Sequence, residues 1–227
     1  RDQLLAANEA IQPGIWAGVV VHLRPLVDDL DEVQVVSLAH VVVGEVVGGG
    51  DLDRACAKRW IHDAIGKPVL MLVKNTHAVI EVPVDQIEAA RSALAHLRPG
   101  IKVMSAGDSI EIFKEVGLPK DVAARFGVSR MHGTHGIGHT RMATESAVTT
   151  MGAHPFSTGS DQCLVHNGSL SNHNGVRREL KRQGMTFETE NDTEVAAAFI
   201  SHKLQEGGKL GEAMEATLTD LDGFFTF

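Results

Sequence analysis

Tyrosine is absent from this chain, and aromatic residues of all kinds make up only 4% of its 227 residues. The hydrophobic core must therefore be built mainly from Val, Leu, Ile, Ala and Met. Cysteine is scarce as well, because Cys56 and Cys163 are too few for a disulfide framework, and a reducing cytoplasmic location is expected. The sequence shows neither a recognisable secretory signal nor an apolar run long enough to cross a bilayer, so we expect no membrane partner.

Positive charge is also in deficit, with 21 Lys and Arg residues against 29 Asp and Glu residues and a formal net charge of −8. Nucleic-acid binding depends strongly on Lys and Arg side chains that neutralise phosphates, so no nucleic-acid partner is expected. The densest basic cluster consists of Arg177, Arg178, Lys181 and Arg182 around Glu179. Its spacing is helical, which predicts the solvent-exposed face of a helix.

The residue pattern divides the chain near residue 74. Before that point, Val-rich runs at 33–36 and 41–47 are typical of strands and Gly48 interrupts them, but no pattern of catalytic residues is visible. We therefore leave residues 1–73 without assignment and treat residues 74–227 as one domain. The chain begins with Arg and ends in LDGFFTF, which has the pattern of a strand start, and we expect a fragment that is incomplete at both ends.

Hydrophobic patterns become regular after residue 74. They predict strands over 76–82, 101–104, 109–116 and 224–227, and helices over 85–97, 119–126, 172–183, 191–204 and 210–221. Asp85 is predicted to cap the first of these helices, and Asn191 with Glu194 has the form of a capping box at the fourth. Helices mixed with short strands of antiparallel character predict an α+β layered fold.

The histidines between 132 and 166 raise the question of a metal site. His132, His135 and His139 have a spacing that would hold zinc only on a helix or a tight loop. Three interspersed glycines disfavour a helix, and in a strand His135 and His139 would lie about 13 Å apart. We therefore predict no metal site.

A serine or cysteine nucleophile is not evident either. No G-x-S-x-G sequence surrounds a serine, and neither cysteine stands in a protease signature. Cys163 lies within the apolar run 162–166, where a small buried hydrophobe is the expected role.

Three features between His135 and Val195 point to the binding of a small zwitterion. Arg141 lies in a polar strand, Asn167-Gly168 follows an apolar run, and Asp192 opens a helix. Each feature also has an ordinary structural explanation, namely a surface ion pair, a hairpin turn and a helix N-cap. The residues alone leave both interpretations open.

The sequence motifs in this stretch resemble those of a known family. The segments are HTRMAT (139–144), HPF (154–156), LVHNGSLSN (164–172) and NDTEV (191–195). In this order and spacing they resemble the glutaminase domain of class II glutamine amidotransferases, which belong to the N-terminal nucleophile hydrolases and share a four-layer αββα sandwich. The forms GTHGIGHTRMATESAVTT and DQCLVHNGSLSNHN are most similar to the glutamate-synthase-like amidotransferase subunit of the type found in N-methylglutamate synthase.

The resemblance implies a role for each of these residues. Arg141 would hold the α-carboxylate of glutamine, a task that suits the guanidinium fork, and Asp192 would bind the α-ammonium group. Thr144 and His154 match positions that line the glutamine pocket. The side chain of Asn167 and the backbone N–H of Gly168 would form the oxyanion hole.

The resemblance also implies a partner and a nucleophile. Ammonia from glutamine would pass to a synthase subunit that binds FMN and iron–sulfur clusters, whereas this chain is expected to bind no cofactor. The family's nucleophile is an N-terminal cysteine, but position 1 here is Arg, so we expect that the nucleophile is missing and the chain as written is inactive. The alternative is a non-catalytic subunit that binds glutamine or serves a structural role in a synthase complex.

Overall fold

The computed structural model describes residues 15–22, 38–45, 59, 62–63, 65–66, 69–97, 101–142 and 149–227. Its strands are β1 (Ile15–His22), β2 (Leu38–Glu45), β3 (Leu70–Lys74), β4 (His77–Pro83), β5 (Ile101–Gly107), β6 (Ile110–Val116), β7 (His135–Met142), β8 (Asn167–Leu170) and β9 (Gly223–Thr226). Its main helices are α3 (Ile87–Leu97), α4 (Pro119–Phe126), α5 (His173–Arg182), α6 (Asp192–Gln205) and α7 (Leu210–Asp220). Cys56, Thr144 and the strand expected at 33–36 lie outside the described residues.

The strands form three antiparallel sheets. A four-stranded sheet has the order β3-β4-β2-β5, a three-stranded sheet has the order β6-β1-β7, and β8 pairs with β9 alone. Strands from residues 1–73 therefore pair with strands from beyond residue 74. The domain boundary near residue 74 stays a prediction.

Alternation along β2 explains how the layers stack. Val41 faces α3 and packs with Ile80 and Leu94, whereas the next residue, Val42, faces the three-stranded sheet and packs with Phe113. On the far side of that sheet, residues of β6 and β7 line one wall of a cavity, and residues of α6 and α7 line another. This succession of helix, sheet, sheet and helix confirms the predicted α+β sandwich.

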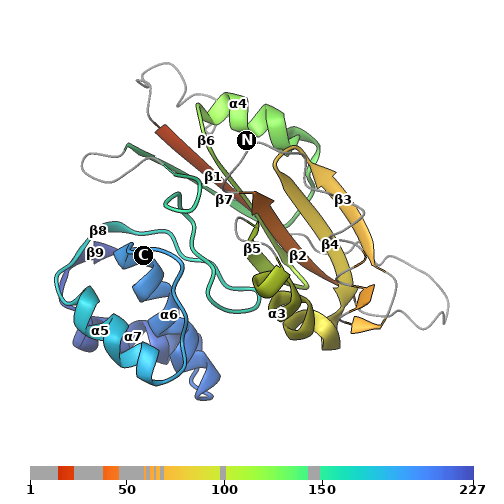
Figure 1. The fold of residues 1–227 in the computed structure, drawn as a ribbon. Coiled ribbons are helices and arrows are strands. Elements are labelled where there is room, and N and C mark those ends of the chain that lie inside the picture. Colours follow the sequence, from red (N-terminus) through yellow and green to blue (C-terminus); the bar gives the residue numbers. More distant parts are fainter. Residues whose placement is uncertain are drawn as a thin grey trace.

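A separate core holds the C-terminal part together. In α6 every residue from Thr193 to Ser201 is buried, as expected for a helix that is covered on all sides. Leu170, Leu180 and Phe199 pack here with residues from α7. We refer to β8, β9 and α5–α7 as the helical lobe, to β1–β7 with α3 and α4 as the sheet lobe, and to residues 149–166 as the connecting segment (Figure 1).

Several local predictions are confirmed and others are wrong. Asn191 caps α6 by accepting a hydrogen bond from Thr193 N at 2.8 Å, and Gly127 ends α4 in the left-handed conformation with φ of 67°. Asp85, however, lies within a short 3-10 helix, Val84–Gln86, that precedes α3 and has no side-chain cap. The apolar run 162–166 forms no regular strand and contributes a single bridge, between Leu164 and Phe156.

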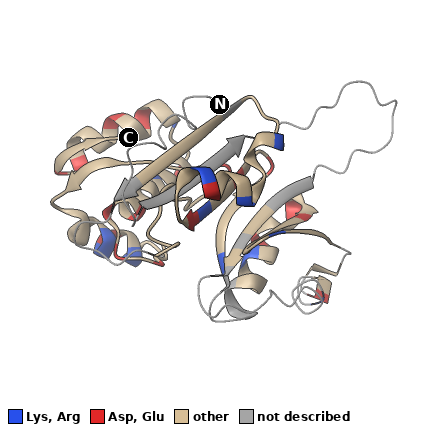
Figure 2. Ribbon diagram, turned by 90° about the horizontal axis from the view of Figure 1, so that it is seen from above, with Lys and Arg blue, Asp and Glu red and all other residues tan. Residues whose placement is uncertain are grey.

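Charged residues are mixed over the surface of the described elements. Figure 2 shows acidic and basic residues side by side on the helices. The basic cluster on α5 is not fully exposed, because the Arg177 side chain is buried while Arg178 is exposed. Within the described part of the chain, no helix is long and apolar enough to cross a membrane.

Candidate active site

The N-terminus of α6 presents a carboxylate beside the start of the helical lobe. Asp192 Oδ2 accepts a hydrogen bond from Leu170 N at 3.1 Å, and Oδ1 lies 3.6 Å from His166 Nδ1. Burial alone would raise the pKa of this carboxyl. The adjacent His166 ring, the Leu170 amide and the nearby His173 outweigh burial and lower the pKa to about 2. The carboxylate is therefore ionised at neutral pH, and its place in the first turn of a helix also favours the negative charge.

Thr193 joins two buried histidines. Its Oγ1 lies 2.8 Å from His154 Nε2 and 3.0 Å from His166 Nδ1. All three side chains are almost completely buried. The hydroxyl group therefore links the connecting segment, which carries both histidines, to the residue that follows Asp192.

His154 also connects this cluster to β7. The rings of His139 and His154 lie 4.4 Å apart between centroids, and Phe156 packs edge-on against His154 at 5.4 Å. Arg141 lies two residues beyond His139 and thus on the same face of the strand. The side chain of Arg141 and the whole of Thr144 lie outside the described part of the structure.

Asn167 and Gly168 begin β8 and do not form a hairpin turn. They pair with Thr226 and Phe225 of β9. Gly168 has φ of 139°, and a Cβ atom built on it would lie 2.1 Å from the carbonyl oxygen of Phe224. Only glycine allows this close pairing, and Asn167 beside it is exposed.

Two buried charged residues, neither of which has a role in the predicted glutamine site, shape the turn before Asp192. The Glu194 carboxylate accepts hydrogen bonds from the backbone N–H groups of Glu188 (2.7 Å) and Thr189 (2.8 Å), so it does not close the predicted capping box. Arg177 from α5 donates to the carbonyl oxygens of Thr189 and Asn191. These contacts fix the backbone that leads into α6.

Lys114 on β6 holds the segment that carries His154. Its Nζ donates to the carbonyl oxygens of Met151 (3.3 Å), Ala153 (3.1 Å) and Pro155 (3.3 Å), and the side chain is 3% exposed. Burial lowers the pKa of this lysine to about 8, with a partial offset from the charge of Glu194. The sequence showed no sign of this role, because Lys114 follows Phe113 in a strand that reads as a packing element.

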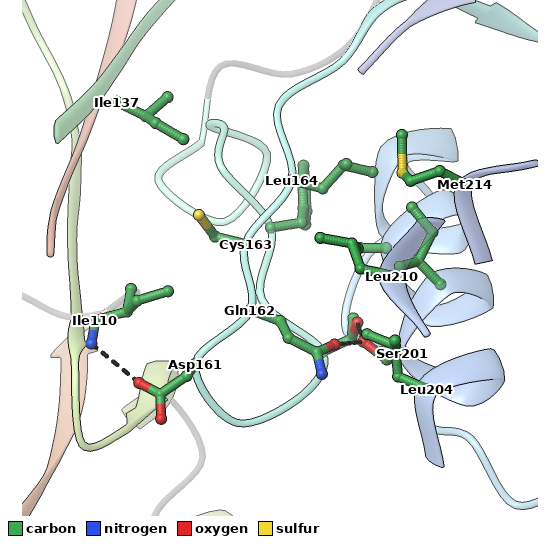
Figure 3. A pocket seen from close by; sticks show the side chains of 14 residues that line it. Ile110, Ile137, Asp161, Gln162, Cys163, Leu164, Ser201, Leu204, Leu210 and Met214 are labelled. Carbon is green, nitrogen blue, oxygen red and sulfur yellow. Dashed lines mark hydrogen bonds between the residues drawn. The ribbon is translucent and has the colours of Figure 1, made fainter. Parts of the chain in front are cut away.

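A cavity of about 330 Å³ lies between the lobes but away from Asp192 (Figure 3). Its walls come from β6, β7, the connecting segment and the later turns of α6, and they are mostly apolar. Cys163 contributes to the wall, and burial raises the pKa of its thiol. Cys163 is partly buried, as a small hydrophobe would be, and its environment disfavours the reactive thiolate.

Metal ligands do not gather at this site within the described residues. No group of three or more His, Cys, Asp or Glu side chains there is placed to hold an ion. His139, His154 and His166 are arranged around ring contacts and the Thr193 hydroxyl.

Comparisons with known proteins agree on one family. Residues 139–227 match the family described as a glutamine amidotransferase domain. The glutamine amidotransferase-like protein GlxB of Rhizobium meliloti (strain 1021) is 61% identical over 177 residues, which are 78% of this chain and 58% of that protein. The glutamine–fructose-6-phosphate aminotransferase of Escherichia coli (strain K12) is 35% identical over 126 residues, which are 56% of this chain and 20% of that protein.

A solved structure was also compared, that of glutamine phosphoribosylpyrophosphate amidotransferase from B. subtilis complexed with ADP and GMP. The matched region covers 51% of this chain and 25% of the chain in that structure. Its TM-score is 0.42 and its sequence identity is 29%. The sequence comparisons thus identify a glutamine amidotransferase domain in this chain. The chain contains a class II glutamine amidotransferase domain of the N-terminal nucleophile type. It spans less than two thirds of the length of the curated relatives that we compared.

Proposed function

We propose that this domain hydrolyses glutamine to glutamate and ammonia at the N-terminus of α6. The observation that carries the proposal is the Asp192 carboxylate, which is ionised and is fixed by the amide of Leu170 at the end of β8. A carboxylate so placed suits the α-ammonium group of an amino acid. Arg141 on β7 would bind the α-carboxylate, because its guanidinium group matches that planar anion.

Asn167 and Gly168 would then stabilise the oxyanion of the tetrahedral intermediate. Both residues begin β8, and they lie three and two residues before Leu170, whose amide binds Asp192. The exposed Asn167 amide and the Gly168 N–H are thus donors close to the ammonium site. Thr144 would complete the pocket, and His154 would support its wall, because the His154 ring is 3% exposed.

The attacking thiolate of this class is an N-terminal cysteine whose α-amine accepts the proton, and we assign this role to a residue other than Cys163. The cavity that Cys163 faces is apolar, and the raised pKa keeps its sulfur protonated. Attack on the glutamine amide carbon would form a γ-glutamyl thioester and release ammonia. Water would then cleave the thioester to glutamate.

The ammonia acceptor would be a glutamate-synthase-like subunit with FMN and iron–sulfur clusters, in the cytoplasm. The similarity of the segments 133–150 and 161–174 to that subfamily supports this partner. The relationship to GlxB supports the amidotransferase part only, because that protein's name states no acceptor.

The test compares matched variants of the full protein in assays of ammonia release and of glutamine binding. Asn167→Ala should lower kcat by about 10² with a smaller change in KM, because an oxyanion donor acts mainly in the transition state. The exposed Asn174→Ala on α5 is the control and should match the wild type. Binding without turnover in the wild type would favour the non-catalytic alternative, and unchanged kcat in Asn167→Ala would remove Asn167 from the mechanism.

A second pair tests the carboxylate clamp. Arg141→Lys should raise KM for glutamine about tenfold or more although the charge is kept, because a bidentate contact becomes a single one. Arg178→Lys on the exposed side of α5 is the control. Equal KM values for both variants would contradict the role of Arg141.

A further inference from the structure

The Thr193 hydroxyl contacts two ring nitrogens although it has a single proton. It lies 2.8 Å from His154 Nε2 and 3.0 Å from His166 Nδ1, and both rings are buried. If it donates to one ring, it must accept from the other. This junction therefore couples the proton positions of the two rings, because the hydroxyl group can donate to only one of them.

The Asp192 carboxylate determines which nitrogen of His166 carries the proton. Its ionised carboxylate can only accept, and Oδ1 lies 3.6 Å from His166 Nδ1, so a proton on that nitrogen is favoured. His166 Nδ1–H then donates to Thr193 Oγ1. The same oxygen also contacts His154 Nε2, as its two lone pairs and one proton allow.

The other nitrogen of His166 supports the same assignment. Among the described residues, His166 Nε2 is buried and has no hydrogen-bond partner, and the ring packs 5.5 Å from Phe227. A buried N–H without an acceptor is rarer and more costly than an unpaired acceptor, so the proton belongs on Nδ1. The polar contacts of this ring are thus directed to Thr193 and Asp192.

We propose that Thr193 and His166 are positioning residues that orient the Asp192 carboxylate for the α-ammonium group of glutamine. The inference rests on the proposed function. Thr193 holds the His166 ring in one orientation and one tautomer, and the Nδ1–H edge then keeps Asp192 Oδ1 in place while the Leu170 amide holds Oδ2. Among the described residues, ionisable groups beside this unit include His173 of α5 and His139 of β7.

The first experiment compares Thr193→Val, which removes the hydroxyl group at nearly constant shape, with Thr193→Ser, which keeps it. Thr193→Val should raise KM for glutamine about tenfold with kcat changed less, as expected for a lost hydrogen bond in a network to a charged group. Thr193→Ser should restore most of the binding. Thr217→Val is the matched control, because Thr217 is a buried threonine whose hydroxyl binds the Met214 carbonyl within α7.

The second experiment uses the His166 side chain. In His166→Asn the amide Nδ2 is bonded to Cγ, as Nδ1 is in histidine, so the variant keeps a donor near the same place. His166→Leu removes it. We expect His166→Asn to bind glutamine more tightly than His166→Leu, and equal KM values would contradict the positioning role.

NMR spectroscopy tests the positioning without any need for turnover. The ¹⁵N spectrum of the wild type should show His166 with its proton on Nδ1, and a ¹³C titration should show a higher pKa for Asp192 in Thr193→Val than in Thr193→Ser. An unprotonated Nδ1 at neutral pH, or the same Asp192 titration in both variants, would overturn the inference. Failure of the wild type to bind glutamine would instead overturn the proposed function, while the two spectra would still decide the positioning claim.

Discussion

His77 is an ionisable residue with no exposed surface. It lies between the two larger sheets, with its ring 4.8 Å from that of Phe126, and its Nδ1 contacts Thr76 Oγ1 at 3.1 Å. Burial lowers the pKa of His77 to about 4, and the charge of Lys114 adds to this effect while that of Glu115 opposes it. The folded protein therefore holds the neutral form of this imidazole.

The position of His77 makes stability depend on pH in a defined window. Between about pH 6.5 and pH 4 the unfolded chain binds a proton at this residue and the folded chain does not, so acid favours unfolding. The free energy of unfolding should fall by about 3 kcal/mol from this residue across that window, and should not depend on it above pH 7. Urea titrations at several pH values would measure the slope in the wild type and in His77→Leu.

The His77→Leu variant should lose this part of the slope, whereas His132→Gln at an exposed position should keep it. Parallel pH profiles for the wild type and His77→Leu would show that the imidazole is charged in the folded state or accessible to water.

Gly168 carries a second constraint at the scale of one residue. Gly168→Ala would place a methyl group 2.1 Å from the Phe224 carbonyl oxygen at a backbone φ of 139°, so β8 and β9 could not stay paired as they are. We expect the free energy of unfolding to fall by about 2–4 kcal/mol. Gly211→Ala in α7 is the control and should stabilise the protein slightly, because nothing lies within 4 Å of the added methyl group and alanine favours helix.

At the scale of the secondary-structure elements, the two faces of β6 contact different parts of the molecule. Phe113 faces the core between the sheets, and the adjacent Lys114 faces the connecting segment, as alternation along a strand requires. The Lys114 amino group satisfies three carbonyl groups that no strand or helix pairs. The backbone around His154 is therefore held by a side chain rather than by regular structure.

Lys114→Met tests this dependence. The substitution keeps most of the apolar volume but leaves three buried carbonyl groups without their donor, so the free energy of unfolding should fall by about 2–4 kcal/mol. Glutamine binding should weaken as well, since His154 supports the proposed pocket. Lys120→Met on the exposed surface of α4 should change neither quantity, and a Lys114→Met protein as stable as the wild type would show that the segment is held by other contacts.

At the scale of the whole molecule, periodic elements were predictable and long-range polar contacts were not. The helix at Pro119–Phe126 and the cap at Asn191 follow from local patterns, which the chain shows within a few residues. Lys114 and Arg177 read as ordinary surface residues because their partners are backbone carbonyl groups that become available only after folding. Asn167-Gly168 reads as a turn because its pairing partner in β9 lies almost 60 residues away, at 223–226.

The two lobes are joined in part by a carboxylate. Asp161 in the connecting segment accepts hydrogen bonds from three consecutive amides at the turn between β5 and β6, which are Asp108 N (3.0 Å), Ser109 N (2.8 Å) and Ile110 N (3.1 Å). Its own N–H donates to the Ala106 carbonyl at 3.0 Å. Figure 3 shows Asp161 beside the cavity between the lobes, on the opposite wall from α6. Asp161 therefore anchors the connecting segment to the sheet lobe.

Asp161→Asn should weaken this anchor while it keeps the size of the side chain. An amide has one acceptor oxygen, and its NH₂ group would oppose an amide donor, so at least one of the three N–H groups loses its partner. We expect the free energy of unfolding to fall by about 1–3 kcal/mol.

Hydrogen exchange measured by mass spectrometry should show faster exchange at residues 108–110 and in the connecting segment of Asp161→Asn. Exchange in α6 should be less affected, because the core of the helical lobe is built from its own residues. Asp63→Asn at an exposed position is the control. Uniform acceleration of exchange across α6 and β6 would instead show that the lobes unfold as one cooperative unit and that Asp161 contributes no more to their junction than to either core.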